Sequence, residues 1–530
     1  MDQQAQLPHE PHLIKYADGE LTWSATGESD EPAGRAKDED VVCILPTAEQ
    51  QGGGYRIVIL KQGSQEDDAP FQLSTVSAKG ISQELLDRHL LKEPPLHLRV
   101  NGSAGLEIHV IVSVGSGTRL AEQFYDSALR PLLELLELQD TDSPTDTTAP
   151  PAVAARQTYK LVKTKDANTI REFAAQRWGA DPAIPSSSIP SRSQTIILLS
   201  GDGGIVDLLN GSSTPTAPGA SHPTIALLPL GTGNALFHSL HKPLYATAPT
   251  PSPFVLGLRT LLTGAPAPLP TFRASFSPGS SLISYSAAPA AAAAAVSGDA
   301  AAAGLQERHD PVDALLGGIV ASYGFHAQLV WESDTPEYRR HGAKRFGMVA
   351  QELLGESHAY KARVAVRRRR GGASPSGEDG AGKTGAAEEE EEEEVFARKR
   401  FAYILATLVS NLERAFTISP ASRPLDGQLR LVHFGAVGGE RTMDIMKAAY
   451  DEGKHVEMRW TTTGDEGKEV EDRVGYDAVE EVRVTVLEED VRWRKVCVDG
   501  TIVEIPQGGS MTVRKVEQPR FKVVVDGSVL

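Results

Sequence analysis

TIILLSGDGGIVDLLNG, residues 195–211, and TIALLPLGTGNALFHSL, residues 224–240, share one pattern. In each stretch an apolar run with the length of a buried strand ends at glycines and then continues with apolar residues at helical spacing. A strand that passes through a glycine turn into a helix leaves unpaired backbone N–H groups at the positive end of the helix dipole, where phosphates bind. Glycine also lets the backbone approach a ligand closely. Two such loops in tandem, one of which carries Asp202, predict a phosphate-binding α/β fold.

Bulk composition limits the class of protein. The chain has 530 residues, a net charge of −17 and 40% hydrophobic residues, so two or three globular domains are expected. The negative charge argues against general nucleic-acid binding, which needs a basic face. Only two cysteines, Cys43 and Cys497, are present, and they fit a reducing, cytoplasmic compartment. The first residues lack a signal-peptide pattern, and no apolar run is long enough to span a bilayer.

Three regions differ in their predicted secondary structure. Residues 1–100 contain short apolar segments such as VVCILPT, YRIVILK and LHLRV, which predict a small β-rich module. Residues 101–265 alternate strand and helix, which predicts a parallel sheet covered on both faces. Residues 266–530 are dominated by strand-like runs, including GGIVASYGFHAQLVW, and predict an antiparallel β-sandwich. Composition predicts disordered insertions in this last region at 277–304 and 371–394.

Several motifs resemble one known family. SGDG followed by PLGTGNAL resembles the catalytic domain shared by diacylglycerol kinases, sphingosine (long-chain-base) kinases and ceramide kinases. The resemblance runs in order from a degenerate first loop, SVGSGT (113–118), through YRRHGAKRF (338–346) to KVCVDGTIVEIP (495–506). It implies a doubly wound α/β domain like that of NAD kinases and diacylglycerol kinases, followed by the β-sandwich. It further implies an ATP-dependent lipid kinase that uses Mg²⁺ and associates peripherally with membranes.

The resemblance assigns roles to residues of the glycine loops. Asp202 would be the general base that takes the proton of the lipid hydroxyl, although aspartate is equally a common turn or helix-cap residue. The other loop residues would contact the nucleotide: Ser116, Gly117, Ser200, Gly201, Gly203, Gly204, Gly231, Thr232, Gly233 and Asn234. Family members often have threonine at the position of Gly204 and Asn-Pro at Ser113-Val114, so the chain departs from the pattern there.

The resemblance also assigns roles in the second domain. Arg339 and Arg345 would bind nucleotide phosphates, because arginine holds phosphate oxygens through two N–H groups. Asp499 would help to organise the metal and the nucleotide, although Asp-Gly is also a favoured hairpin turn. The family motif there is DGE, and Thr501 replaces its glutamate.

The acceptor lipid depends on the segment before YRR. Sphingosine kinases have an aspartate there that pairs with the amine of the base, and the matching position is Gln328, Val330, Glu332 or Asp334. Glu332 and Asp334 are the candidate substrate-binding acids. GTGNAL favours a sphingoid base, whereas Val330 at that position would favour a neutral lipid such as diacylglycerol or ceramide.

Two other functions remain open at this point. A soluble NAD kinase shares the GDG loop, and the departures from the motif suggest a catalytically inactive scaffold that binds nucleotide or membrane. The run YKARVAVRRRR (360–370) could dock on anionic lipids, and the acidic run 388–394 could compete for its arginines. The plainer interpretation of both runs is a solvated linker.

Overall fold

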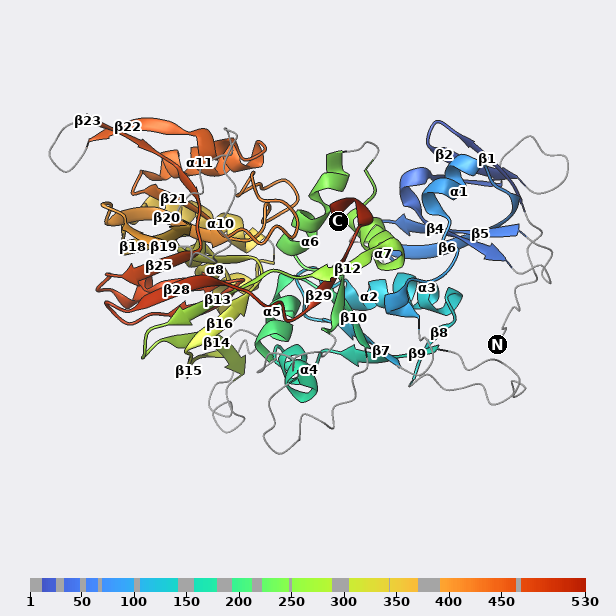
Figure 1. Ribbon diagram of the computed structural model, residues 1–530, viewed down its shortest axis with the longest axis horizontal. Coiled ribbons are helices and arrows are strands. Elements are labelled where there is room, and N and C mark those ends of the chain that lie inside the picture. The colour runs from blue at the N-terminus through green and yellow to red at the C-terminus, as the bar shows by residue number, and fades with distance from the viewer. Residues whose placement is uncertain are drawn as a thin grey trace, which may run out of the picture. The chain divides into compact units, whose positions relative to one another are not determined.

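The computed structural model describes residues 12–24, 33–47, 54–64, 69–99, 105–141, 157–178, 193–211, 222–246, 250–287, 305–342, 344–369, 391–463 and 469–530. The chain divides into two compact units, Met1–Leu269 with Arg520–Leu530, and Pro270–Pro519 (Figure 1). Residues 520–530 therefore belong to the first unit, although the sequence analysis grouped them with the second domain. None of the helices in the described ranges is long and apolar enough to cross a membrane.

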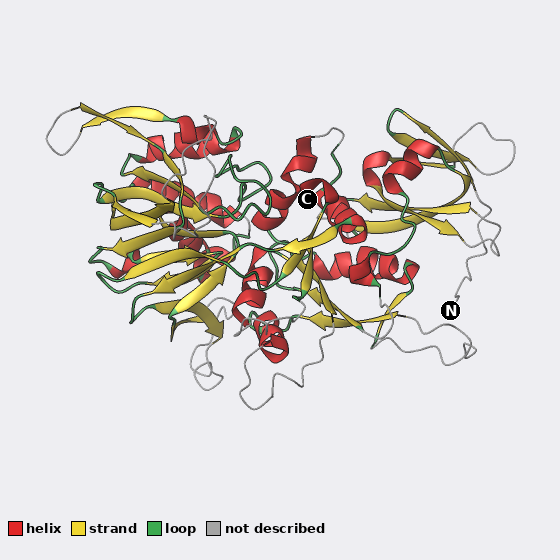
Figure 2. Cartoon of the chain, in the orientation of Figure 1, coloured by secondary structure: helices red, strands yellow, loops and turns green. Residues whose placement is uncertain are grey.

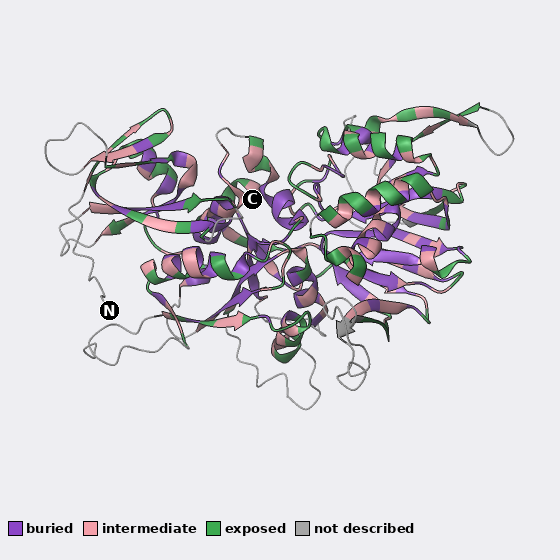
Figure 3. Cartoon of the chain, turned by 180° about the vertical axis from the view of Figure 1, so that it is seen from behind, coloured by how far each residue is buried: buried purple, intermediate pink, exposed green. Residues whose placement is uncertain are grey.

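The first unit contains a seven-stranded sheet with the order β12-β29-β11-β10-β7-β9-β8. All neighbours pair in parallel except β12 with β29. Its strands are β7 (Leu106–Val112), β8 (Leu138–Asp140), β9 (Gln157–Lys163), β10 (Ser193–Ser200), β11 (Thr224–Pro229), β12 (Ala265–Pro268) and β29 (Lys522–Val525). The predicted mixed α/β unit is confirmed, and its long apolar runs are central strands with buried side chains (Figure 3).

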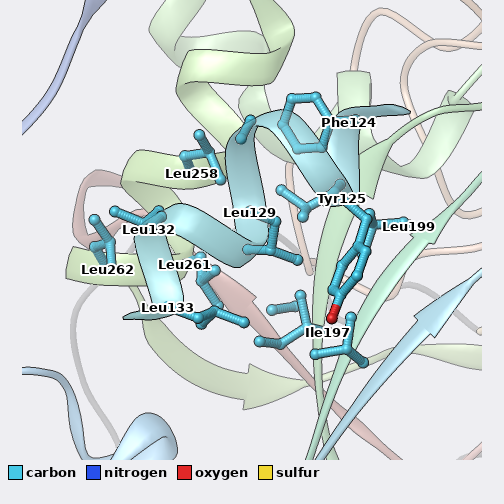
Figure 4. Close-up of a cluster of buried hydrophobic side chains, with 14 of the residues drawn as sticks. Phe124, Tyr125, Leu129, Leu132, Leu133, Ile197, Leu199, Leu258, Leu261 and Leu262 are labelled. Atoms are coloured by element: carbon cyan, nitrogen blue, oxygen red, sulfur yellow. The ribbon is translucent and has the colours of Figure 1, made fainter. Parts of the chain in front are cut away.

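Helices cover both faces of this sheet, as the strand–helix alternation predicts. On one face, Ile197 and Leu199 of β10 pack against Phe124, Leu129 and Leu258 (Figure 4). These three side chains come from α2 (Ala121–Phe124), the π-helical turn Tyr125–Leu129 that continues into α3 (Arg130–Leu135), and α7 (Pro253–Thr263). The other face is covered by α4 (Thr169–Trp178) and α5 (Asp202–Gly211). The remaining helix of this part is α6 (Ala235–His241).

The region 12–98 forms a second sheet of six strands in the first unit, with the order β3-β2-β1-β6-β5-β4. Its strands are β1 (His12–Ala17), β2 (Glu20–Ser24), β3 (Gly34–Lys37), β4 (Val41–Thr47), β5 (Gly54–Gln62) and β6 (Phe71–Gly80), followed by α1 (Gln83–His89). Phe71 packs edge-on against Phe124 and Phe254, with ring centroids 5.0 and 4.9 Å apart. The two sheets of the first unit therefore share one hydrophobic core.

The second unit is built on antiparallel strands, as predicted (Figure 2). Hydrogen bonds join them into one 14-stranded sheet, in which β18 (Tyr360–Arg369) pairs with both β20 (Arg400–Thr407) and β25 (Glu481–Val486). The sheet is curled, because β16 at one end of the strand order contacts β26 near its middle. The strands thus form one continuous sheet rather than the two separate sheets of a sandwich.

The remaining elements of the second unit complete this sheet and cover it. The other strands of the sheet are β13 (Thr271–Phe276), β14 (Ser281–Ala287), β15 (Leu305–Pro311), β16 (Ala314–Gly317), β17 (Val320–Gly324), β19 (Glu391–Val395), β21 (Arg430–Gly435), β24 (Gly475–Ala478), β26 (Lys495–Val498), β27 (Thr501–Glu504) and β28 (Ser510–Val516). A separate hairpin consists of β22 (Arg459–Thr463) and β23 (Glu469–Arg473). The helices are α8 (Phe325–Ser333), α9 (Pro336–Arg339), α10 (Lys344–Glu356) and α11 (Gly439–Tyr450).

Four further sequence predictions differ from the structure. GGIVASYGFHAQLVW is not one strand, because Gly324 has a φ of 91° and ends β17 directly before α8. LHLRV forms a 3₁₀ turn at Leu96–Leu98 instead of a strand. Residues 281–287 of the predicted disordered insertion form β14, and 391–394 of the other insertion belong to β19. Residues 288–304 and 371–390 lie outside the described ranges.

Candidate functional site

Three loops meet at the carboxyl edge of the parallel sheet. They follow the adjacent strands β7, β10 and β11, so the topology places them side by side. The amide of Gly201 donates to Ser116 Oγ at 2.9 Å, and Thr118 Oγ1 donates to the carbonyl of Leu230 at 2.9 Å. The first loop, which departs most from the family pattern, therefore ties the two glycine loops together through its hydroxyl groups. Thr118 was missed by the sequence analysis because a hydroxyl in a loop gives no distinctive signal.

Glycine is required where these loops touch. A Cβ on Gly231 would lie 2.3 Å from the Cα of Gly201, and one on Gly117 would lie 2.5 Å from the amide nitrogen of Thr232. Both distances are shorter than any real Cβ contact, so the backbones pack with no room for a side chain. Glycine is also required at position 204, for a different reason: a Cβ added there would lie 2.7 Å from Ser200 Oγ. Ser200 therefore fills the space that a side chain at position 204 would occupy.

Asp202 holds the two glycine loops in register. It is the first residue of α5, yet its carboxylate accepts hydrogen bonds from the first amides of α6, Ala235 N at 2.7 Å and Leu236 N at 3.1 Å. Burial raises the pKa of this carboxyl, and the two backbone N–H groups act in the opposite direction. Each carboxylate oxygen keeps a second lone pair that can accept a further proton. Asp202 thus caps the neighbouring helix rather than its own.

The side chain of Asn234 stabilises the second loop by hydrogen bonds within that loop. Its side-chain oxygen accepts from the amide of Gly231 and its side-chain NH₂ donates to the carbonyl of Gly231, both at 2.9 Å. Its backbone adopts the left-handed conformation, with φ 52°. The side chain is buried and directed at its own loop, so the predicted contact with a nucleotide would have to come from the backbone of this loop.

Backbone donors remain available at the site. Among the described residues, the amides of Gly203, Thr232 and Gly233 make no hydrogen bond to a protein acceptor. Gly203 is exposed, and a Cβ there would meet nothing within 4 Å. Free amides at the start of α5 and in the adjoining loop are the donor set that binds phosphate oxygens. These residues therefore fit the triphosphate of a nucleotide.

The sequence of this region matches a known domain. Residues 107–252 match the diacylglycerol kinase catalytic domain. The match covers all three loops and ends before the second unit begins. A comparison with curated proteins gives no match.

Solved structures include three similar chains from Bacillus anthracis str. Sterne. The first two are candidate diacylglycerol kinases that are 12% identical; they cover 81% and 80% of this chain and 98% of their own, with TM-scores of 0.44 and 0.42. The third, described as a diacylglycerol kinase, is also 12% identical, covers 80% of this chain and 98% of its own, and has a TM-score of 0.38.

The predicted arginines and acids of the second unit lie together. Arg339 binds Asp334 through two hydrogen bonds, Nε to Oδ1 at 3.0 Å and Nη2 to Oδ2 at 2.6 Å, and Arg345 Nη2 lies 3.7 Å from Asp334 Oδ1. Glu332 Oε1 accepts from Gln328 Nε2 at 2.6 Å and from Arg492 Nε at 3.0 Å. Both acids proposed for a substrate amine therefore already have guanidinium partners. Val330, the third alternative, packs in an apolar cluster with Ala327 and Ile502.

Asp499 has an internal role in the second unit. It lies in the two-residue turn between β26 and β27, as the DG motif predicts, with φ 47°. Its buried carboxylate accepts from three successive amides, Gly318 at 2.6 Å, Ile319 at 3.1 Å and Val320 at 2.5 Å. Glu504, the next carboxylate along β27, pairs with Lys495 at 2.8 Å. Neither carboxylate is positioned as an open metal ligand, and the described residues contain no group of three or more potential ligands.

Replacing Asp499 by asparagine should lower the free energy of unfolding. The amide NH₂ would face at least one of the three buried N–H donors, and an unsatisfied buried donor costs about 1–3 kcal/mol. Urea denaturation without metal measures this loss. A normal stability without Mg²⁺ combined with a lower stability with Mg²⁺ would instead identify Asp499 as a metal ligand.

Proposed function

We propose that this chain is an ATP-dependent lipid kinase that transfers the γ-phosphate to a lipid hydroxyl. The observation that carries the proposal is the convergence of the loops after β7, β10 and β11, with free amides beside the carboxylate of Asp202. Phosphoryl transfer depends mainly on holding phosphates and orienting a hydroxyl nucleophile, and these are the groups that do both. The match of residues 107–252 to the diacylglycerol kinase catalytic domain supports the same activity.

In the proposed reaction, the lipid hydroxyl oxygen attacks the γ-phosphorus and its proton passes to Asp202. The bond between the γ-phosphorus and the β–γ bridging oxygen breaks, and ADP leaves with that oxygen. The amides of Gly203, Thr232 and Gly233 would stabilise the phosphate oxygens, and Arg339 and Arg345 are the proposed further cations. Mg²⁺ bound with ATP would supply charge neutralisation. Because burial raises the pKa of Asp202, its carboxylate is a stronger base than that of an exposed aspartate.

The direct test incubates the full chain with labelled ATP and a panel of acceptors. Transfer to any lipid supports the proposal, transfer to NAD would identify a soluble NAD kinase, and ATP binding with no transfer to any acceptor would identify an inactive scaffold. ATP binding is measured separately by calorimetry, so that an inactive preparation is distinguished from a scaffold.

Two acceptor classes have specific support. The GTGNAL loop favours a sphingoid base, which carries an amine. The ion pairs of Glu332 with Arg492 and of Asp334 with Arg339 favour a neutral lipid, because both candidate carboxylates already have a guanidinium partner.

We expect ceramide or diacylglycerol to be phosphorylated more efficiently than sphingosine. A hydrogen-bonded partner for a charged group contributes about 1.5–3 kcal/mol, so kcat/KM should differ by roughly tenfold or more. The measurement compares the acceptors in the same detergent micelles. A strong preference for sphingosine would contradict this expectation. If Asp334→Asn then lost activity on sphingosine but retained activity on ceramide, Asp334 would be the amine partner.

A further inference from the structure

One face of the second unit carries an array of cations. Strands β18, β25, β28 and β13 are adjacent and pair in continuous register, so alternate residues of all four share a face. The inward positions are apolar and buried, for example Val364, Val484, Val513 and Ala274. The outward positions include six cations: Lys361, Arg363, Arg367, Arg483, Arg514 and Arg273. We call these six side chains the arginine face.

A single buried acid organises the centre of the arginine face. Glu481 lies 3.5 Å from Arg367, 3.7 Å from Arg483 and 3.6 Å from Arg514. Glu393 of β19 also lies near Arg483, so the six cations of the face stand against two described acids and positive charge is in excess. Arg273 and Arg363 are exposed on the flanking strands, and in the described ranges neither forms an ion pair. The charge of the arginine face is therefore positive, whereas the whole chain has a net charge of −17.

The acidic run contributes one edge of this surface. Its residues 391–394 lie in β19, which pairs with the arginine-rich end of β18. Glu393 shares the outward side and lies 3.8 Å from Arg483, while Glu394 pairs with Arg368 on the other side of the sheet. These two runs are therefore not a solvated linker where the structure describes them. Glu393 beside Arg483 shows that the arginine face accepts a carboxylate group.

We propose that the arginine face binds the anionic surface of a lipid bilayer. The inference deepens the proposed function, on which it rests, by stating how the enzyme reaches a lipid from the water side. Each Lys or Arg near an anionic membrane surface contributes to binding, and a row of them on an open sheet contacts many headgroups at once. None of the described outward positions on these four strands carries an aromatic ring, which single-stranded nucleic acids need for base stacking. Glu393 competes with the membrane for Arg483.

The test is co-sedimentation of the full chain with vesicles, without ATP. Binding to phosphatidylcholine vesicles that contain phosphatidylserine should exceed binding to phosphatidylcholine alone and should fall with salt. Arg273→Gln combined with Arg363→Gln should weaken it about 25-fold, since each cation is worth about a factor of five. These two arginines are chosen because changing them leaves the partners of Glu481 in place. Glu393→Gln should strengthen binding about fivefold.

The matched control removes two exposed cations from α11, Arg441→Gln and Lys447→Gln, and should leave vesicle binding unchanged. The proposal would be overturned by equal binding to both kinds of vesicle, or by a loss of vesicle binding in the control as large as that in the double arginine variant. Tighter binding of a DNA duplex through Arg273 and Arg363 would also overturn it. Turnover on detergent-dispersed lipid should be the same in all these variants. Vesicle binding through the arginine face without any turnover would uphold this inference while the kinase assignment fails.

Discussion

Replacing Asp202 by asparagine should lower kcat for lipid phosphorylation by about 10²–10⁴-fold, the usual contribution of a general base. Asparagine has nearly the same shape, but it cannot take the proton of the lipid hydroxyl. Its side-chain oxygen can still accept from one of the amides of Ala235 and Leu236, while its NH₂ group would face the other. The dissociation constant for ATP should therefore change little. Single-turnover kinetics and calorimetry with ATP measure the two quantities.

The structure makes a second outcome of this substitution informative. If Asp202 serves only to cap α6, Asp202→Asn should reduce the free energy of unfolding by about 1–3 kcal/mol and leave kcat at low temperature nearly unchanged. Retained turnover in a destabilised protein would thus remove Asp202 from the reaction and leave it the role of joining the two loops. A large loss of kcat in a protein that still binds ATP would assign it both roles.

Replacing Gly231 by alanine should destabilise the first unit severely. Its Cβ would lie 2.3 Å from the Cα of Gly201, and both atoms belong to backbone that is fixed by neighbouring strands. Overpacking of this kind costs about 1–3 kcal/mol or more, and here no flexible side chain can move aside. We expect a variant that is poorly soluble or that unfolds many degrees below the parent chain. Thermal unfolding followed by circular dichroism measures the difference.

Gly203→Ala is the matched control for that substitution. A Cβ at this position meets nothing within 4 Å, and the residue is exposed, so stability should stay within about 0.5 kcal/mol of the parent. The same methyl group would stand where a phosphate approaches the free amide, so ATP binding should weaken. Unchanged ATP affinity in a stable Gly203→Ala protein would contradict the placement of the phosphates at the start of α5.

The local signals in the sequence were sufficient for the α/β part of the fold. β10 and β11 each contain a continuous apolar run, 196–199 and 225–228, as expected of strands covered on both faces, and the glycines after them mark the turns into α5 and α6. The Asp499-Gly500 turn was equally readable, because a two-residue hairpin demands residues that tolerate positive φ. In these places the decisive interactions lie within a few residues of one another.

Long-range partners could not be read in this way. Nothing near Asp202 indicates that its carboxylate reaches the amides of Ala235 and Leu236, and nothing near Glu332 indicates Arg492 as its partner. The β17–α8 junction was misread because the apolar run continues through Gly324, and only the positive φ of that glycine separates strand from helix. The arginine face depends on the register of four strands distant in sequence, so the runs at 360–370 and 388–394 looked like a linker.

The strand formed by residues 522–525 has a consequence for how this chain matures. It occupies a place between β11 and β12, which precede it by more than 250 residues in the printed sequence. Until residues 522–525 leave the ribosome, the nascent parallel sheet has a gap between β11 and β12, with exposed main-chain edges on both sides. Closing it brings together segments at extreme sequence separation, which is a slow, late event in folding. Because of that order of assembly, we expect chains truncated before residue 520 to aggregate. We also expect a chaperone to assist the chain during synthesis.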